Sequence, residues 1–193
     1  MPESKAHLRT GSQGDRTLKT EGRATRLLAG WLPFCLSLAA CQPVMPKDLA
    51  DFKSDGCSMF PDGSYYSCCY LHDVAYWPGG TAEARELADK SLRDCVADIT
   101  HNEVLAEAMY KGVRVGGGPG LRTPYRWGYG WPFPYRKEYS PLTPEELSQV
   151  ARKTQTLCTT FRLNPSTGGF VVLIADVDRE ISAEQARQIC PGL

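Results

Sequence analysis

The sequence lacks an excess of charge of either sign. Its 193 residues carry 22 Lys and Arg against 22 Asp and Glu, so the formal net charge is zero. Residues 1–41 hold six basic and three acidic side chains, whereas residues 42–193 hold sixteen and nineteen. A nucleic-acid-binding domain usually gathers a basic excess on one face. We therefore predict no nucleic-acid partner.

The chain also lacks an apolar run long enough to span a bilayer, which takes about 20 residues. The apolar run 27–40 follows two arginines and has the length of a signal-peptide core. It ends in Leu38-Ala39-Ala40-Cys41, which looks like a bacterial lipobox. We therefore predict a signal peptide over 1–41 and a lipid anchor at Cys41, in the bacterial envelope on the periplasmic face of the outer membrane. An ordinary signal peptide or a buried helix is the alternative.

No Gly-x-Ser-x-Gly motif of an activated serine occurs, so a hydrolase of this sequence would use water as its nucleophile. Cleavage of the leader and acylation of Cys41 would leave six of the eight cysteines. An even number of cysteines in an exported protein predicts three disulfides, although the number alone does not choose the pairing. These six are Cys57, Cys68, Cys69, Cys95, Cys158 and Cys190.

The stretch 68–76, Cys-Cys-Tyr-Leu-His-Asp-Val-Ala-Tyr, places a histidine beside a carboxylate. At about 100° per residue, Cys68, His72 and Tyr76 share one face of a helix, and Cys69 and Asp73 share another. A neutral imidazole can take a proton from water near neutral pH, so His72 is a candidate general base. A carboxylate offers the hard oxygen ligands that calcium prefers.

This stretch resembles the histidine–aspartate helix of the secreted phospholipase A2 family, Cys-Cys-x-x-His-Asp-x-Cys-Tyr. Ala75 stands where the family has a third cysteine. Residues 88–95 resemble the family's Cys-Asp-x-x-x-x-x-Cys segment, with Ala88 in place of the cysteine that bonds the third one. Both members of one family disulfide are thus alanine. Residues 55–63 stand where the family places its calcium loop, and the resemblance covers roughly residues 52–115.

The resemblance implies a calcium-dependent hydrolase that cleaves the middle ester of a glycerophospholipid. His72 would be the base, Asp89 the carboxylate that orients it, and Tyr76 a second partner of Asp89. The Ca²⁺ ligands would be the carboxylate of Asp73 and the backbone carbonyls of Gly56, Ser58 and Phe60. The family's loop carries glycine at the positions of Ser58 and Phe60, and it is longer. The implied disulfides are Cys57–Cys69 and Cys68–Cys95, which leaves Cys158 with Cys190.

Two other interpretations remain open. One is a non-catalytic envelope lipoprotein that uses a disulfide-linked helix pair as a scaffold for lipid or protein. The other is a zinc site made of Cys68, Cys69, Cys95 and His72, which the oxidising compartment disfavours. The remaining histidines are expected to have no role, because His101 would lie on a helix surface and His7 in the leader.

The predicted fold is mainly α. A tether (42–55) precedes a phospholipase A2-like core (56–115), in which helices from Tyr65 to Trp77 and from Thr81 to about Lys111 run antiparallel. Residues 143–193 form a helix–strand–helix extension with two capping boxes and a strand at 170–175. Phospholipid membrane is the predicted partner.

Residues 116–142 are rich in Gly, Pro and aromatic side chains, which excludes a long helix. Basic and aromatic residues alternate there, as they do in segments that lie on a membrane interface. The candidates for membrane contact are Trp127, Trp131, Arg126 and Arg136. The alternative is an ordered loop that wraps the helix pair and buries its rings.

Overall fold

The computed structural model describes residues 48–193, so the predicted signal peptide, its lipobox and Cys41 lie outside the described residues. Within this part the protein is mainly helical with a small antiparallel sheet, which confirms the predicted class at that level. The helices are α1 (Tyr66–Tyr76), α2 (Ala82–Thr100), α3 (Glu103–Gly116), α4 (Pro144–Cys158) and α5 (Ala183–Ile189). The strands are β1 (Arg162–Leu163), β2 (Phe170–Ile174) and β3 (Val177–Ile181). None of the helices described here is both long and apolar enough to cross a membrane.

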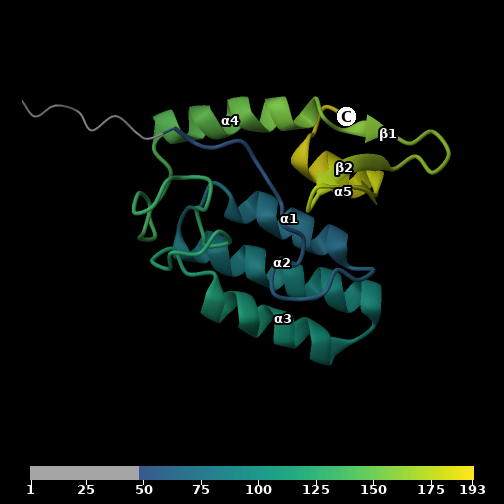
Figure 1. Cartoon of the computed structure of the whole chain (residues 1–193), viewed down its shortest axis with the longest axis horizontal. Helices are drawn as coiled ribbons and strands as arrows, with labels where there is room; N and C mark the ends of the chain where they lie inside the picture. Colours follow the sequence, from purple (N-terminus) through teal and green to yellow (C-terminus); the bar gives the residue numbers. More distant parts are fainter. Residues whose placement is uncertain (1–47) are drawn as a thin grey trace, which may run out of the picture. The chain divides into compact units, whose positions relative to one another are not determined.

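Helices α1 and α2 run in opposite directions, with a short turn between them. Gly79 and Gly80 take φ values of +71° and +148° in this turn, which favour glycine. The Thr81 side chain then caps α2 by accepting from the Ala84 amide at 3.1 Å. Residues later in α1 contact residues earlier in α2. Cys68 is bonded to Cys95, and Tyr76, further along α1, is hydrogen-bonded to Arg85. In Figure 1, α2 lies between α1 and α3.

The predicted helix from Thr81 to about Lys111 is wrong, because the chain forms two helices there. His101 ends α2 in the left-handed conformation, at φ 51°. The Asn102 side chain then caps α3 by accepting from the Leu105 amide at 3.0 Å. This turn lets α3 fold back and pack Ala106 and Met109 into the core that α2 shares with α1. The apolar residues from Thr81 to Lys111 have the spacing of one continuous helix. The chain nevertheless breaks into two helices, because the break lets the apolar face of α3 be buried.

Three disulfides join the cysteines that the sequence marks for pairing: Cys57–Cys69, Cys68–Cys95 and Cys158–Cys190. The first links the segment before α1 to that helix, and the second links α1 to α2. The third joins the end of α4 to the residue that follows α5. The first two agree with the pairings that the phospholipase A2 resemblance implies, and the third is the pairing that those two leave.

The C-terminal extension has more strand than predicted. Strand β2 pairs with β1 on one side and with β3 on the other, and both pairings are antiparallel. The sequence gives little sign of the β2–β3 hairpin, because its turn residues Ala175 and Asp176 reach positive φ without glycine. The sheet and α5 cover Tyr70 of α1, which is 1% exposed.

The segment before α1 belongs to the folded body, although it lies in the predicted tether. Leu49 is 1% exposed, and it packs with Trp77 and Trp131. The Phe52 ring meets the rings of Tyr70 and Trp77 edge-on, at centroid distances of 5.4 and 5.8 Å. The segment before α1 therefore packs against Tyr70 and Trp77, in and just after α1.

Candidate active site

The three predicted catalytic residues meet between α1 and α2. The Nε2 atom of His72 lies 2.9 Å from Oδ1 of Asp89. The Tyr76 hydroxyl donates to the same oxygen at 2.6 Å. Asp89 is fully buried, and His72 is 8% exposed. One carboxylate therefore holds both the imidazole and the phenol.

The second oxygen of Asp89 is held by an arginine that the sequence interpretation missed. Arg114, near the end of α3, donates from Nη1 to Oδ2 of Asp89 at 2.6 Å. Arg85 donates from Nε to the Tyr76 hydroxyl at 2.9 Å and lies 3.7 Å from Oδ2 of Asp89. Arg85 precedes Asp89 by one helical turn, which is a sequence signal for a contact. No local pattern points to Arg114, because α3 brings it to Asp89 from elsewhere in the chain.

These donors keep Asp89 ionised. Burial alone would raise the pKa of Asp89, but hydrogen bonds from His72, Tyr76 and Arg114 outweigh burial and lower that pKa below its ordinary value. The pKa of Tyr76 is raised, first by burial and then by the charge of Asp89. At neutral pH the carboxylate is therefore an acceptor, and the phenol is a donor.

This orientation leaves one nitrogen of the imidazole free. Because Nε2 faces an ionised carboxylate, it carries the ring's proton. No hydrogen bond joins Nδ1 of His72 to another residue among those described in 48–193. Nδ1 is thus the nitrogen that can accept a proton from a water molecule.

His72 and Asp73 line a cleft of about 470 Å³ with mostly apolar walls. The walls come from the segment before α1 and from α2 and α3, namely Met59, Phe60, Leu92, Met109, Val113 and Val115. Met59 and Val115 are 81% and 82% exposed, so two large apolar side chains of the cleft face solvent. Such a cleft suits an apolar ligand chain with a polar group near the imidazole.

Asp73 is a buried carboxylate in an acidic surrounding. Burial raises its pKa well above the ordinary value, and the charges of Asp55 and Asp62 raise it further. Hydrogen bonds from the Ser54 hydroxyl, at 2.6 Å, and from the Asp55 backbone oppose that rise in part. A cation beside Asp73 would compensate the charge that burial and the neighbouring acids disfavour.

The predicted calcium loop lines the same cleft. Gly56, Ser58 and Phe60 all border it together with Asp73. The backbones of Gly56 and Ser58 are both left-handed, at φ +76° and +52°. This conformation favours glycine, which the phospholipase A2 family has at the second position and this chain does not. The Ser58 hydroxyl donates to Asp55 at 3.0 Å and helps to hold this conformation.

The donor set fits calcium by its chemistry, because a carboxylate and backbone carbonyls are all hard oxygen ligands. Among residues 48–193 no group of three or more His, Cys, Asp or Glu side chains is placed to hold a metal ion. A cation at Asp73 would therefore depend on the loop carbonyls for its other protein ligands. The zinc interpretation is wrong, because Cys68, Cys69 and Cys95 are all in disulfides and offer no thiolate.

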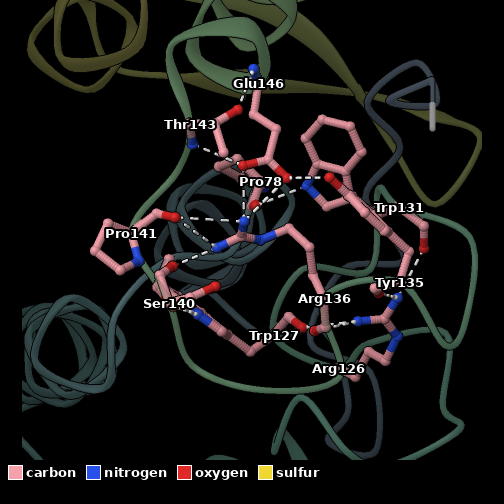
Figure 2. A network of polar contacts seen from close by, with 11 residues as sticks. Pro78, Arg126, Trp127, Trp131, Tyr135, Arg136, Ser140, Pro141, Thr143 and Glu146 are labelled. Atoms are coloured by element: carbon pink, nitrogen blue, oxygen red, sulfur yellow. Dashed lines mark hydrogen bonds and ion pairs between the residues drawn. The ribbon is translucent and has the colours of Figure 1, made fainter. Parts of the chain in front are cut away.

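The prediction of membrane contact by the aromatic loop is wrong for its four candidates, which are buried within the protein. Arg126, Trp127 and Trp131 are 2%, 3% and 2% exposed, and the Arg136 side chain is 6% exposed. Figure 2 shows Arg126 and Trp131 in contact with backbone carbonyls and Arg136 in contact with Glu146. The structure agrees with the alternative, an ordered loop that buries its rings.

This buried loop supports the turn between α1 and α2. The indole N–H of Trp131 donates to the carbonyl of Pro78 at 2.8 Å (Figure 2). The indole N–H of Trp127 donates to the carbonyl of Gly80 at 3.0 Å. The Trp127 ring also meets the Tyr76 ring edge-on, with centroids 4.9 Å apart. The loop therefore packs against Tyr76, which donates a hydrogen bond to Asp89.

A scan of protein-family models finds no match to this chain, and comparisons with curated proteins and with solved structures find none either. The geometry of the site and the residue pattern that predicts it are therefore what bears on the function.

Proposed function

We propose that the protein is a phospholipase A2-like hydrolase that cleaves an ester of a glycerophospholipid, by resemblance the middle one, with the help of calcium. The observation that carries this proposal is the 2.9 Å contact between His72 and Asp89 at an apolar cleft. The pairing of His72, Tyr76 and Asp89 across two disulfide-linked helices supports a phospholipase A2-like arrangement of α1 and α2.

In this reaction His72 acts as the general base. Its Nδ1 takes a proton from water, and the oxygen of that water attacks the ester carbonyl in the cleft. The proton then passes to the leaving alcohol, so the imidazole returns to its neutral form. No covalent enzyme intermediate is needed, which agrees with the absence of an activated serine motif.

Asp89 fixes the tautomer and stabilises the imidazolium. A buried anion 2.9 Å from Nε2 favours the positive charge that His72 acquires when it takes the proton. Tyr76 donates to the same carboxylate oxygen at 2.6 Å, so the carboxylate keeps its position as the charge on the ring changes.

Calcium, when bound, would supply a Lewis acid that offsets charge developing on the carbonyl oxygen. Asp73 and the backbone carbonyls of Gly56, Ser58 and Phe60 would hold it. The Cys57–Cys69 disulfide fixes this loop to the residue one helical turn before Asp73. The Ser58 amide would donate to the same developing charge.

The shape of the cleft suits a lipid substrate. Its volume of about 470 Å³ lies within the range of about 300–1,000 Å³ that is typical of small-molecule sites. Its apolar walls would accept an acyl chain, while His72 and Asp73 meet the ester. A lipid anchor at Cys41, in the part of the chain outside the described residues, would keep the cleft close to its substrate in the bacterial envelope.

A non-catalytic lipid-binding protein is the second candidate. The observation in its favour is that Asp73 already accepts hydrogen bonds from Ser54 and from the Asp55 backbone, which a structural carboxylate would also do.

The two functions are separated by incubating the purified protein with phospholipid vesicles and measuring released fatty acid, with calcium or with a chelator. Release that requires calcium supports the hydrolase. Vesicle binding without release would support the second candidate and reject the first.

A further inference from the structure

We propose that Arg114 is a positioning residue, whose guanidinium fixes the Asp89 carboxylate and through it the His72 imidazole. This inference rests on the proposed hydrolase function. It assigns a role to a side chain of α3, a helix that supplies none of the residues implied by the resemblance.

The division of contacts on Asp89 is the first reason. Oδ1 accepts from His72 and Tyr76, and both of these donors come from α1. Oδ2 accepts its one hydrogen bond among the described residues from Arg114, at 2.6 Å. The last side-chain torsion of an aspartate is broad, so a carboxylate held at one oxygen can rotate. Arg114 therefore adds, at the second oxygen, a restraint against the rotation that would carry Oδ1 away from Nε2 of His72.

The backbone of Arg114 is itself held in place. Nη2 of Arg85 donates to the carbonyls of Val113 and Arg114, at 2.7 and 2.9 Å. Arg85 is 3% exposed and also bonds the hydroxyls of Tyr76 and Tyr139. The end of α3 is thus tied to α1 and α2, which keeps Arg114 in reach of Asp89.

Exposure makes Arg114 suitable for substitution. Its side chain is 32% exposed, whereas Asp89 is fully buried. Arg114 does not line the 470 Å³ cleft, so shortening it should leave substrate contacts unchanged. A change in kcat without a change in KM is therefore the expected signature of a positioning role.

The experiment compares the full protein with Arg114→Met, Arg114→Lys and the control Arg162→Met. Arg162 makes the same type of ion pair, at 2.5 Å to Asp178, but both partners are exposed on the C-terminal sheet. We expect Arg114→Met to lower kcat about tenfold or more at unchanged KM, by analogy with residues that orient ligands of metal sites. Arg114→Lys should restore part of the loss, and Arg162→Met should match the wild type.

A second measurement is independent of activity. The imidazole N–H proton of His72 in its bond to Asp89 should give a strongly downfield resonance in the NMR spectrum. This signal should persist in the wild type and in Arg162→Met, and it should broaden or vanish in Arg114→Met. If Arg114→Met does not fold, Arg114→Gln carries both measurements.

An unchanged kcat and an unchanged imidazole signal in the folded Arg114 variants would overturn the inference. So would a change in KM alone, which would make Arg114 a substrate contact. If the wild type releases no fatty acid, the proposed function fails, whereas the NMR comparison still tests whether Arg114 positions His72.

Discussion

His72 and Asp89 lie 2.9 Å apart, one helical turn along α1 from the disulfide that joins α1 to α2. The Cys68–Cys95 bond sets the level at which the helices face each other, and this level brings Asp89 opposite His72 and Tyr76. The chemistry proposed for this site depends on that alignment.

We expect Asp89→Asn to lower the rate of ester hydrolysis by about a hundredfold or more, because the amide cannot stabilise the imidazolium and can favour the wrong tautomer. The rate is measured as initial fatty-acid release at saturating lipid. Asp94→Asn is the matched control, since Asp94 lies on the same helix with its side chain 62% exposed. An active Asp89→Asn variant would contradict the role of Asp89 as the partner of His72.

The lowered pKa of Asp89 predicts a dependence of stability on pH. Because this pKa is depressed in the folded state, the ionised carboxylate stabilises the protein above the unfolded value of about 3.9, and this contribution is lost as pH falls through the folded pKa. Below about pH 4 the free energy of unfolding should therefore fall more steeply in the wild type than in Asp89→Asn. Equal slopes in acid denaturation would contradict the shift.

The raised pKa of Asp73 predicts that calcium stabilises the protein to a degree that depends on pH. The Asp73 shift is opposite in sign to that of Asp89. Ionisation of Asp73 costs folding free energy as pH rises through its folded pKa, and a bound cation would offset that cost. Calcium should thus raise the melting temperature more at neutral or alkaline pH than in mild acid. Differential scanning calorimetry measures this shift, and Asp73→Asn should abolish it. A calcium effect that survives in Asp73→Asn would place the cation elsewhere.

Ala75 and Ala88 mark a position for a fourth disulfide. They lie seven residues along α1 and seven residues back along α2 from Cys68 and Cys95, and both line a groove formed by α1, α2 and α5. Seven residues are about two helical turns, so the pair repeats the relation of the existing bridge. The double variant Ala75→Cys with Ala88→Cys should form a disulfide and stabilise the protein by about 3 kcal/mol.

Mass spectrometry with and without a reductant identifies the new bond, and denaturant unfolding measures its effect. Either single cysteine variant serves as the control. Two free thiols in the folded double variant would show that the helices diverge beyond the reach of a disulfide at this level.

The aromatic loop contributes to stability through a buried ion pair. Arg136 donates to Glu146 at 2.8 Å, and the two side chains are 6% and 1% exposed. Arg136→Met removes the cation and leaves a buried carboxylate, which should cost about 3 kcal/mol of unfolding free energy. Arg162→Met, at an exposed pair, should cost less than about 1 kcal/mol. Similar losses in the two variants would contradict the burial of Glu146.

Local patterns in the sequence were sufficient for several parts of the structure. The capping residues Thr81 and Thr143 begin α2 and α4 as predicted, because a capping hydrogen bond depends only on neighbouring residues. The spacing of Cys68, His72 and Tyr76 on one helix face also places His72 and Tyr76 on Asp89 once α2 is paired with α1.

Features that depend on distant contacts were missed. The break at His101 appears only when α3 packs back on α2, and the contact of Arg114 with Asp89 follows from that packing. The indole of Trp131 is amphipathic, so its pattern suits a membrane interface as well as a buried loop. Burial decides between them, since the carbonyl of Pro78 accepts its N–H.

The most direct test of the central claim is the rate of fatty-acid release from phospholipid vesicles by the wild type and by His72→Gln. Glutamine occupies a similar space but cannot take the proton from water. With calcium present, we predict measurable release by the wild type and at least about a hundredfold less by folded His72→Gln. Equal release by the two proteins would contradict a mechanism in which His72 activates water.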